Sequence, residues 1–178
     1  MDVVIAGIGQ VPVGEHWDLS LRELAYQAMQ AALIDSGGLR PQALFVGNML
    51  APNLSGQAHL GVLLADFAGL DGIEAYVVEE AGASGGAALR AGYLAIKSGF
   101  VDVALVVGIE KLTDKIGPEV ENAITTSLES DYEAVPGSTP LAQAALLMRR
   151  YFYEFGLPAN ALAGFPVTAH ANGVSNPY

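Results

Sequence analysis

The chain has 178 residues, 52% of them hydrophobic, with a formal net charge of −11 and no cysteine. This length and composition predict a globular domain with a substantial core and exclude a disordered chain. With 8 Lys and Arg against 19 Asp and Glu, a nucleic-acid partner is not expected, and without cysteine there are no disulfides, Cys-ligated metals or thiol nucleophiles.

An apolar stretch, Val3–Ala6, opens the chain and predicts a first strand. No basic segment precedes it, as a signal peptide would require, and no apolar run reaches the roughly 18 residues of a membrane span. We therefore expect a cytoplasmic protein without a membrane partner. Gly7 and Gly9 match part of a dinucleotide fingerprint, but Pro12 takes the place of its third glycine, which favours a plain strand-to-loop connection.

Helical and strand patterns then alternate. Ser20 and Glu23 form a capping box before an apolar helical face that ends at Gly37 and Gly38. The elements predicted after it are a strand over Ala43–Leu50, a helix over Ser55–Ala68, a strand over Ala75–Val78, a helix over Ala87–Lys97 capped by Gly99, and a strand over Val101–Val107. This alternation predicts an α/β fold, with a mostly parallel sheet and helices on both faces.

Small residues fill the turn between the third strand and its helix, Gly82–Gly86. The turn directs a helix N-terminus, with its unpaired N–H groups and positive dipole end, at residue 82. Such a terminus stabilises a thiolate or an oxyanion, so we expect the functional centre here. Glu110 and Lys111 follow the last predicted strand, and for them a structural role or a subunit contact is favoured.

After Asp114 the alternation of apolar strands and helices gives way to a polar segment. Residues 115–139 are polar and predict a long loop, which in a compact domain is usually functional or bound to a partner. An amphipathic helix is predicted over Pro140–Glu154, and another over Pro158–His170, where Pro166 would break or kink it.

The turn and its surroundings resemble the nucleophile segment of thiolases, closest to the archaeal acetoacetyl-CoA and sterol-carrier-protein branch. Glu79–Gly86 is similar to the family's Glu-Ala-Ala-Cys-Ala-Ser-Gly-Gly, Gly108–Asp114 to its Gly-Val-Glu-Lys-Met-Thr-Asp, and residues 170–177 to its His-x-Asn-Gly-x-x-Asn-Pro. The departure falls at Gly82, because thiolases carry their nucleophilic Cys there.

The resemblance implies a thiolase-like layered fold. Residues 1–114 would form an incomplete N-terminal α/β domain, and residues 115–178 would begin the loop domain that covers coenzyme A. The first domain's last strand, the second domain, and the family's catalytic His and second Cys have no counterpart. We expect a fragment, or a chain that folds with a partner supplying the rest.

The resemblance also implies an acyl-CoA acyltransferase of the acetyl-CoA C-acetyltransferase type, active in lipid metabolism. A coenzyme A thioester would be the substrate, with no covalently bound cofactor and no metal. A homodimer or homotetramer and a small zinc and OB-fold partner protein are implied as well. Because Gly82 has no side chain, we expect no acyl-enzyme, which leaves a nucleophile-independent acyl-CoA aldolase and a non-catalytic thiolase-like subunit as alternatives.

Four further residues are assigned to the substrate site: Ser84, Met148, His170 and Asn172. Met148 offers an apolar wall for a pantetheine arm, although helix core is its simpler role. His170 and Asn172 rest on the resemblance alone, and Ser84 is typical of a helix cap.

A remote alternative is a serine hydrolase, because Gly82–Gly86 also satisfies the G-x-S-x-G nucleophile elbow with Ser84 at its centre. Asp114 or Asp131, followed by His170, stand in the hydrolase order. No strand is evident between Asp131 and His170 to carry the histidine, which argues against this alternative.

Overall fold

The computed structural model describes residues 2–178, which divide into two compact units. The first unit ends at Val120, and the second runs from Glu121 to Tyr178. The first contains every strand that the described residues form, together with the turn at residue 82.

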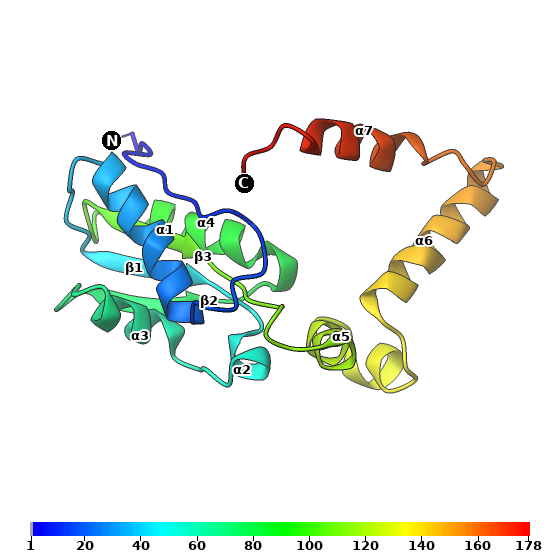
Figure 1. The fold of residues 1–178 in the computed structure, drawn as a ribbon, viewed down its shortest axis with the longest axis horizontal. Helices are drawn as coiled ribbons and strands as arrows, with labels where there is room; N and C mark the ends of the chain where they lie inside the picture. The colour runs from blue at the N-terminus through cyan, green and yellow to red at the C-terminus, as the bar shows by residue number, and fades with distance from the viewer. Residues whose placement is uncertain (1) are drawn as a thin grey trace. The chain divides into compact units, whose positions relative to one another are not determined.

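The first unit is built on a three-stranded parallel sheet (Figure 1). Its strands are β1 (Ala43–Gly47), β2 (Glu74–Val78) and β3 (Ala104–Gly108), in the order β2-β1-β3. Gly47 at the end of β1 lies in register with Val78 and Gly108. The parallel sheet confirms the α/β fold predicted from the alternating pattern.

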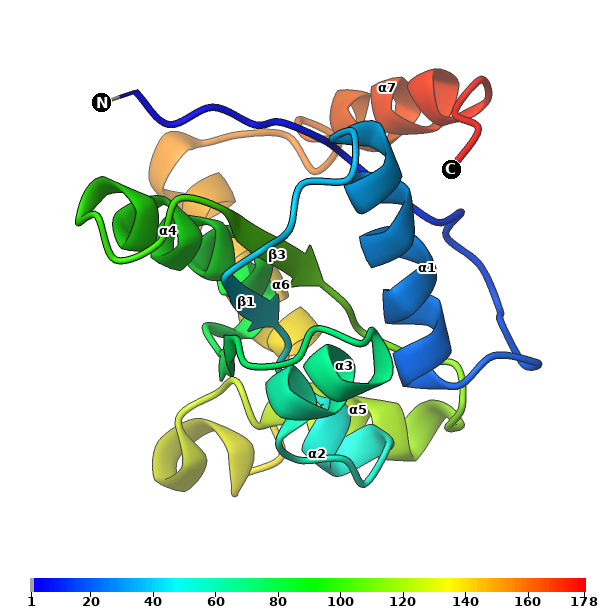
Figure 2. The same ribbon diagram turned by 90° about the vertical axis from the view of Figure 1, so that its left-hand side faces the viewer.

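Helices cover both faces of the sheet, as predicted (Figure 2). One face carries α4 (Ser84–Lys97), and the other carries α1 (Leu21–Asp35) and α3 (Leu60–Phe67). Successive residues of a strand point to opposite faces, so β1 contributes to both cores and is buried along its whole length. The α4 side holds Ala43, Phe45, Ala88 and Val101, whereas the opposite side holds Met29, Leu44, Val46, Leu60 and Leu64, among others.

The capping box predicted at the start of α1 is present. The Glu23 amide donates to Ser20 Oγ at 3.3 Å, and the Ser20 amide donates to Glu23 Oε2 at 2.8 Å. Hydrogen bonds from the Ser20 hydroxyl and then from its amide lower the pKa of the Glu23 carboxyl below its ordinary value. The stabilisation from this pair is therefore present above the unfolded-state pKa and is lost as the pH falls through the lowered folded-state value.

The strand predicted over Val3–Ala6 is wrong, because the structure forms no strand within residues 2–20. Val4 and Ile5 are 76% and 75% exposed. The Ile8 amide instead donates to Asp35 Oδ2 in α1, at 2.9 Å. The apolar residues alone do not make a strand here, since the segment lies against a helix and not beside another strand.

Gly7 and Gly9 belong neither to a dinucleotide fingerprint nor to a plain strand-to-loop connection, the two roles weighed from the sequence. A Cβ atom on Gly9 would lie 2.2 Å from the Ala28 carbonyl oxygen, and one on Gly7 would lie 2.5 Å from the Ala32 carbonyl oxygen. No side chain fits at such distances. The two glycines therefore allow the N-terminal backbone to lie directly on the backbone of α1.

Several helices and strands begin or end at residues other than those predicted from the sequence. The strand predicted over Ala43–Leu50 ends at Gly47, because Asn48 begins a turn that leads into the short helix α2 (Ala51–Leu54). The helix predicted to begin at Ser55 begins at Leu60, after His59 in a left-handed conformation with φ of 60°.

The helix after the turn at residue 82 begins earlier than predicted, at Ser84 and not at Ala87. At its other end, Gly99 has φ of 77°, as expected for a residue just past a helix.

The long loop predicted over residues 115–139 is also wrong. It contains α5 (Gly117–Thr125) and a single π-helical turn (Ser130–Ala134). Beyond it, α6 (Pro140–Phe155) begins at the capping residue Thr139, which accepts from the Ala142 amide at 3.2 Å. The last helix, α7 (Gly164–Gly173), begins so close to Pro166 that this proline lies in its first turn, where proline is tolerated.

Candidate functional site

The loops that follow the three parallel strands lie at one edge of the sheet, where α/β folds place their sites. The first turn of α4 crosses this edge at close range. A Cβ atom on Gly47 would lie 2.6 Å from the Ser84 carbonyl oxygen and 2.8 Å from Gly85 Cα, and one on Gly108 would lie 3.7 Å from Gly85 Cα. The N-terminus of α4 is thus seated on the ends of β1 and β3.

Residue 82 lies in a short 3-10 turn, Ala81–Ala83, immediately before α4. Gly82 is exposed, and a Cβ atom built on it would meet nothing within 4 Å. A turn with positive φ would be a structural reason for a glycine here, but the positive φ of 46° belongs to Ala81. The backbone therefore does not need glycine at residue 82, and there is space for a side chain.

Ala81 holds a conformation that costs an alanine about 1–2 kcal/mol. The Ala83 amide donates to the Glu80 carbonyl oxygen at 2.8 Å across the turn, and three side-chain hydrogen bonds surround Ala81 as well. Its amide donates to Glu79 Oε1 at 2.5 Å, the Glu80 amide donates to Ser84 Oγ at 2.9 Å, and the Ser84 hydroxyl donates to the Ala81 carbonyl oxygen at 2.7 Å. Ser84 is the first residue of α4 and only 5% exposed. Its side chain binds backward into the turn and not forward as a helix cap.

A second polar cluster joins the ends of β1 and β3 and pairs Glu110 with Asn48, which was not predicted as its partner. Glu110 Oε2 accepts from the amides of Met49 and Leu50, at 3.2 and 2.8 Å. The Asn48 side chain donates to Glu110 Oε1 at 3.1 Å and accepts from the Ala51 amide at 3.0 Å. The available signal was the asparagine directly after a buried strand. These bonds join two strand ends, as expected for the structural role, which is one of the two roles predicted for Glu110.

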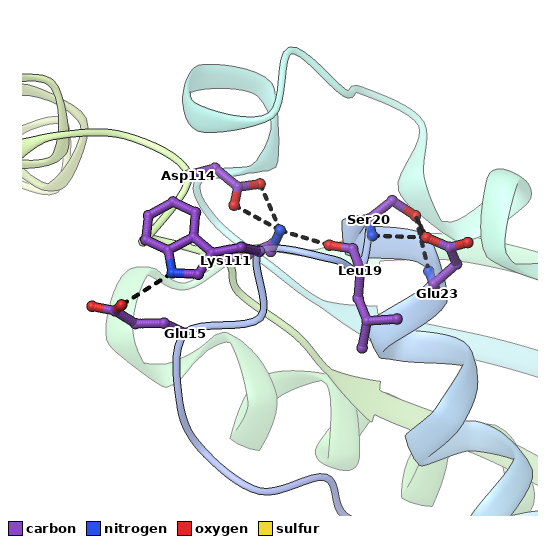
Figure 3. Close-up of polar contacts among 7 residues, drawn as sticks. Glu15, Leu19, Ser20, Glu23, Lys111 and Asp114 are labelled. Carbon is purple, nitrogen blue, oxygen red and sulfur yellow. Dashed lines mark hydrogen bonds and ion pairs between the residues drawn. The ribbon is translucent and has the colours of Figure 1, made fainter.

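Lys111 is buried, with 5% of its surface exposed. Its Nζ donates to the Leu19 carbonyl oxygen at 2.6 Å and pairs with Asp114, 2.6 Å from Oδ1 (Figure 3). It thereby fastens the loop before α1 to the segment after β3. An open pocket of about 400 Å³ lies beside it, lined by Trp17, Asp18, Leu19, Ser20, Lys111 and Asp114. Gly82 is not among the lining residues, so this pocket is separate from the turn.

We expect Lys111→Met to lower the free energy of unfolding by about 2 kcal/mol, because it leaves the Leu19 carbonyl oxygen and a two-thirds-buried carboxylate without their cation. Urea unfolding of the full-length protein measures this. The matched control is Lys115→Met, which removes an exposed ion pair with Glu119 and should change stability by less than about 0.5 kcal/mol. Equal effects of the two substitutions would contradict the role given to Lys111.

The predicted site residues fall in both units. Gly82 and Ser84 lie in the first, whereas Met148 in α6 and His170 and Asn172 in α7 lie in the second, all three exposed. Contact of these three with the turn stays a prediction. The hydroxyl of Ser84 is bonded to two backbone groups and not to a histidine.

The residues that the structure describes contain no group of three or more His, Asp or Glu side chains arranged to hold a metal ion. No helix within residues 2–178 is long and apolar enough to cross a membrane.

Comparison with known proteins finds relatives that are named as acetyl-CoA acetyltransferases and as a thiolase subunit. The chain is 40% identical over 178 residues to an acetyl-CoA acetyltransferase of Methanothermobacter thermautotrophicus, covering 99% of this chain and 46% of the relative. It is 39% identical to an acetyl-CoA acetyltransferase of Methanocaldococcus jannaschii, covering 99% of this chain and 45% of that relative. It is 31% identical to the benzoylsuccinyl-CoA thiolase subunit BbsB of Thauera aromatica, covering 99% of this chain and 44% of that protein.

The chain thus spans a little under half the length of the curated relatives it matches. The family described as thiolase, N-terminal domain, matches residues 3–178. This match includes the parallel sheet, the turn at residue 82 and α4. The chain therefore belongs to the thiolase family, over its N-terminal domain.

Proposed function

We propose that the protein containing this chain is an acyl-CoA enzyme of the thiolase type, with its reaction centre at residue 82. One observation carries the proposal. The turn Ala81–Ala83 presents residue 82 with open space around it, directly before the N-terminus of α4 and at the carboxyl edge of the parallel sheet. A thioester carbonyl that is attacked there would develop negative charge close to the helix N-terminus, which favours it.

The acyltransferase route needs a cysteine nucleophile at residue 82. The cysteine sulfur would bond to the acyl carbon as the bond from that carbon to the sulfur of coenzyme A breaks, and coenzyme A would leave as its thiol. Gly82 supplies no such atom. We therefore propose that the protein carrying Gly82 binds acyl-CoA without forming an acyl-enzyme.

Two other functions remain alternatives. An acyl-CoA aldolase would cleave a carbon–carbon bond beside the thioester without a covalent intermediate, which an absent nucleophile permits. A non-catalytic thiolase-like subunit would bind a partner chain and show no turnover. The relative from Thauera aromatica, which is named a thiolase subunit, favours keeping this alternative.

The substrate proposal is a coenzyme A thioester, and the two archaeal relatives named for acetyl-CoA support a short acyl chain. Met148, His170 and Asn172 would contact this substrate. We propose further a homodimer or homotetramer, a small zinc and OB-fold partner protein, a cytoplasmic location and a role in lipid metabolism, with no cofactor beyond coenzyme A.

The test uses the full-length protein with Gly82. We expect titration calorimetry to show binding of coenzyme A and acetyl-CoA, and intact-mass measurement after acetyl-CoA treatment to show no added acetyl group. Absence of binding by folded protein would contradict the proposal, as would a covalent acetyl adduct. Cleavage of a 3-hydroxyacyl-CoA would favour the aldolase, and binding without cleavage would favour the subunit.

A further inference from the structure

The strained backbone conformation near the proposed reaction centre belongs to Ala81, the residue before Gly82. Within residues 2–178, Ala81 and His59 are the two non-glycine residues with positive φ. Gly82, which would adopt a positive φ without penalty, does not have one. A strained alanine next to a relaxed glycine means that the surrounding contacts, and not the residue at 82, impose the shape of the turn.

The Ser84 side chain supplies two of those contacts. Its hydroxyl accepts from the amide of Glu80 and donates to the carbonyl oxygen of Ala81, so it binds the chain on both sides of the strained residue. Ser84 is 5% exposed, so its hydroxyl is largely shielded from water, and both bonds are partly buried. The third side-chain bond, from the Ala81 amide to Glu79, is exposed, and backbone bonds from the Ala83 and Ser84 amides also close the turn.

The anchor is itself fixed. The backbone of Ser84 and Gly85 lies so close to Gly47 at the end of β1 that no Cβ atom fits between them. A side chain that starts from this point has a defined position relative to the sheet. The hydroxyl of Ser84 therefore transmits the position of the sheet edge to the turn that carries residue 82.

We infer that Ser84 is a positioning residue, whose hydroxyl holds Ala81 in its left-handed conformation and so fixes the position of the group at residue 82 directly before the N-terminus of α4. This role differs from substrate contact, helix capping and nucleophilic attack. It rests on the proposed function only in that residue 82 is the reaction centre. The Ser84 hydroxyl donates its proton to the Ala81 carbonyl oxygen, so this proton is used in a structural bond.

The test places a thiol at residue 82 as a reporter. The chain has no cysteine, so Gly82→Cys introduces the only thiol within these residues, and peptide mapping isolates it in the full-length protein. Its pKa is measured from the rate of iodoacetamide alkylation against pH. Turnover is measured as thiolysis of acetoacetyl-CoA, with kcat and KM separated.

With Ser84 intact, we expect this thiol to titrate below the value of about 8.5 for a free cysteine, because it lies at a helix N-terminus. Adding Ser84→Ala should raise its pKa by about half a unit or more, toward the free value. The same change should lower kcat about tenfold or more and leave KM within about twofold, because a misaimed nucleophile still binds substrate. Ser84→Thr, which keeps the hydroxyl, should restore most of both quantities.

Ala81→Gly is the second variant, because glycine adopts the positive φ without being held there. In the background of Gly82→Cys with Ser84→Ala, it should recover folding where that is lost and return the thiol pKa toward the value measured with Ser84. Failure of this compensation in folded protein would overturn the inference. So would a Ser84→Ala variant that unfolds more easily but keeps the same thiol pKa and kcat.

The two proposals fail in different ways. If Gly82→Cys gives no thiolysis but its thiol pKa still responds to Ser84, the acyltransferase proposal fails and the positioning role stands. If thiolysis occurs and neither quantity depends on the hydroxyl, the positioning role fails alone.

Discussion

Gly82→Cys in the full-length protein is expected to produce thiolysis of acetoacetyl-CoA, with turnover at least about 1,000-fold above the protein with Gly82. Removal of a covalent nucleophile from other enzymes lowers turnover by up to about 10⁶-fold, so its introduction into a prepared site should have a large effect. The site can accept the side chain, because Gly82 has an ordinary φ and open space at its Cβ position. Release of acetyl-CoA is the measurement.

The matched control is Gly14→Cys. Gly14 is also exposed and also has no atom within 4 Å of a Cβ, but it lies in the loop before α1 and does not directly precede a helix. A thiol there should remain inactive. If the Gly82→Cys protein is folded and binds coenzyme A but is inactive, residue 82 has not lost a nucleophile, and the aldolase or the non-catalytic subunit becomes the better proposal.

Gly47→Ala is expected to lower the free energy of unfolding by about 3 kcal/mol, or to prevent folding. The added methyl group would lie 2.6 Å from the Ser84 carbonyl oxygen and 2.8 Å from the backbone of Gly85. These are backbone atoms, which cannot move aside as the end of a flexible side chain can. Relief of the overlap requires the start of α4 to lift from the sheet. Urea unfolding of the full-length protein measures the loss.

Gly108→Ala serves as the control, because Gly108 ends β3 in register with Gly47. An added Cβ there would lie 3.7 Å from Gly85 Cα, an ordinary contact. We expect a change of less than about 1 kcal/mol, in either direction. Similar losses from the two substitutions would mean that overlap with α4 does not govern the effect, since the lower flexibility of the unfolded chain would raise stability at both positions.

The position of α4 and the conformation of the turn before it depend on different contacts. Gly47 determines where α4 begins, and the hydroxyl of Ser84 determines the conformation of the residues before it. A side chain at residue 82 can therefore be introduced without altering either contact. This separation makes the turn suitable for testing the nucleophile and its support independently.

The sequence by itself determined the architecture of the first unit. A continuous apolar run predicted β1, because a central parallel strand is covered on both faces. Ser20 and Glu23 predicted the start of α1, since a capping box depends on residues only three positions apart. The small residues Gly82–Gly86 located the strand–turn–helix unit at which the function is proposed. All of these signals are local.

The tertiary structure decided what depends on contacts between distant residues. Val3–Ala6 has the composition of a strand, but the backbone directly after it lies on α1, where Gly7 and Gly9 allow the close approach. The strained residue proved to be Ala81 and not the glycine beside it, because the Ser84 hydroxyl and the Glu79 carboxylate hold the turn. The residue type determines which backbone conformations have low energy for an isolated residue. The conformation that the residue adopts also depends on its contacts in the folded protein.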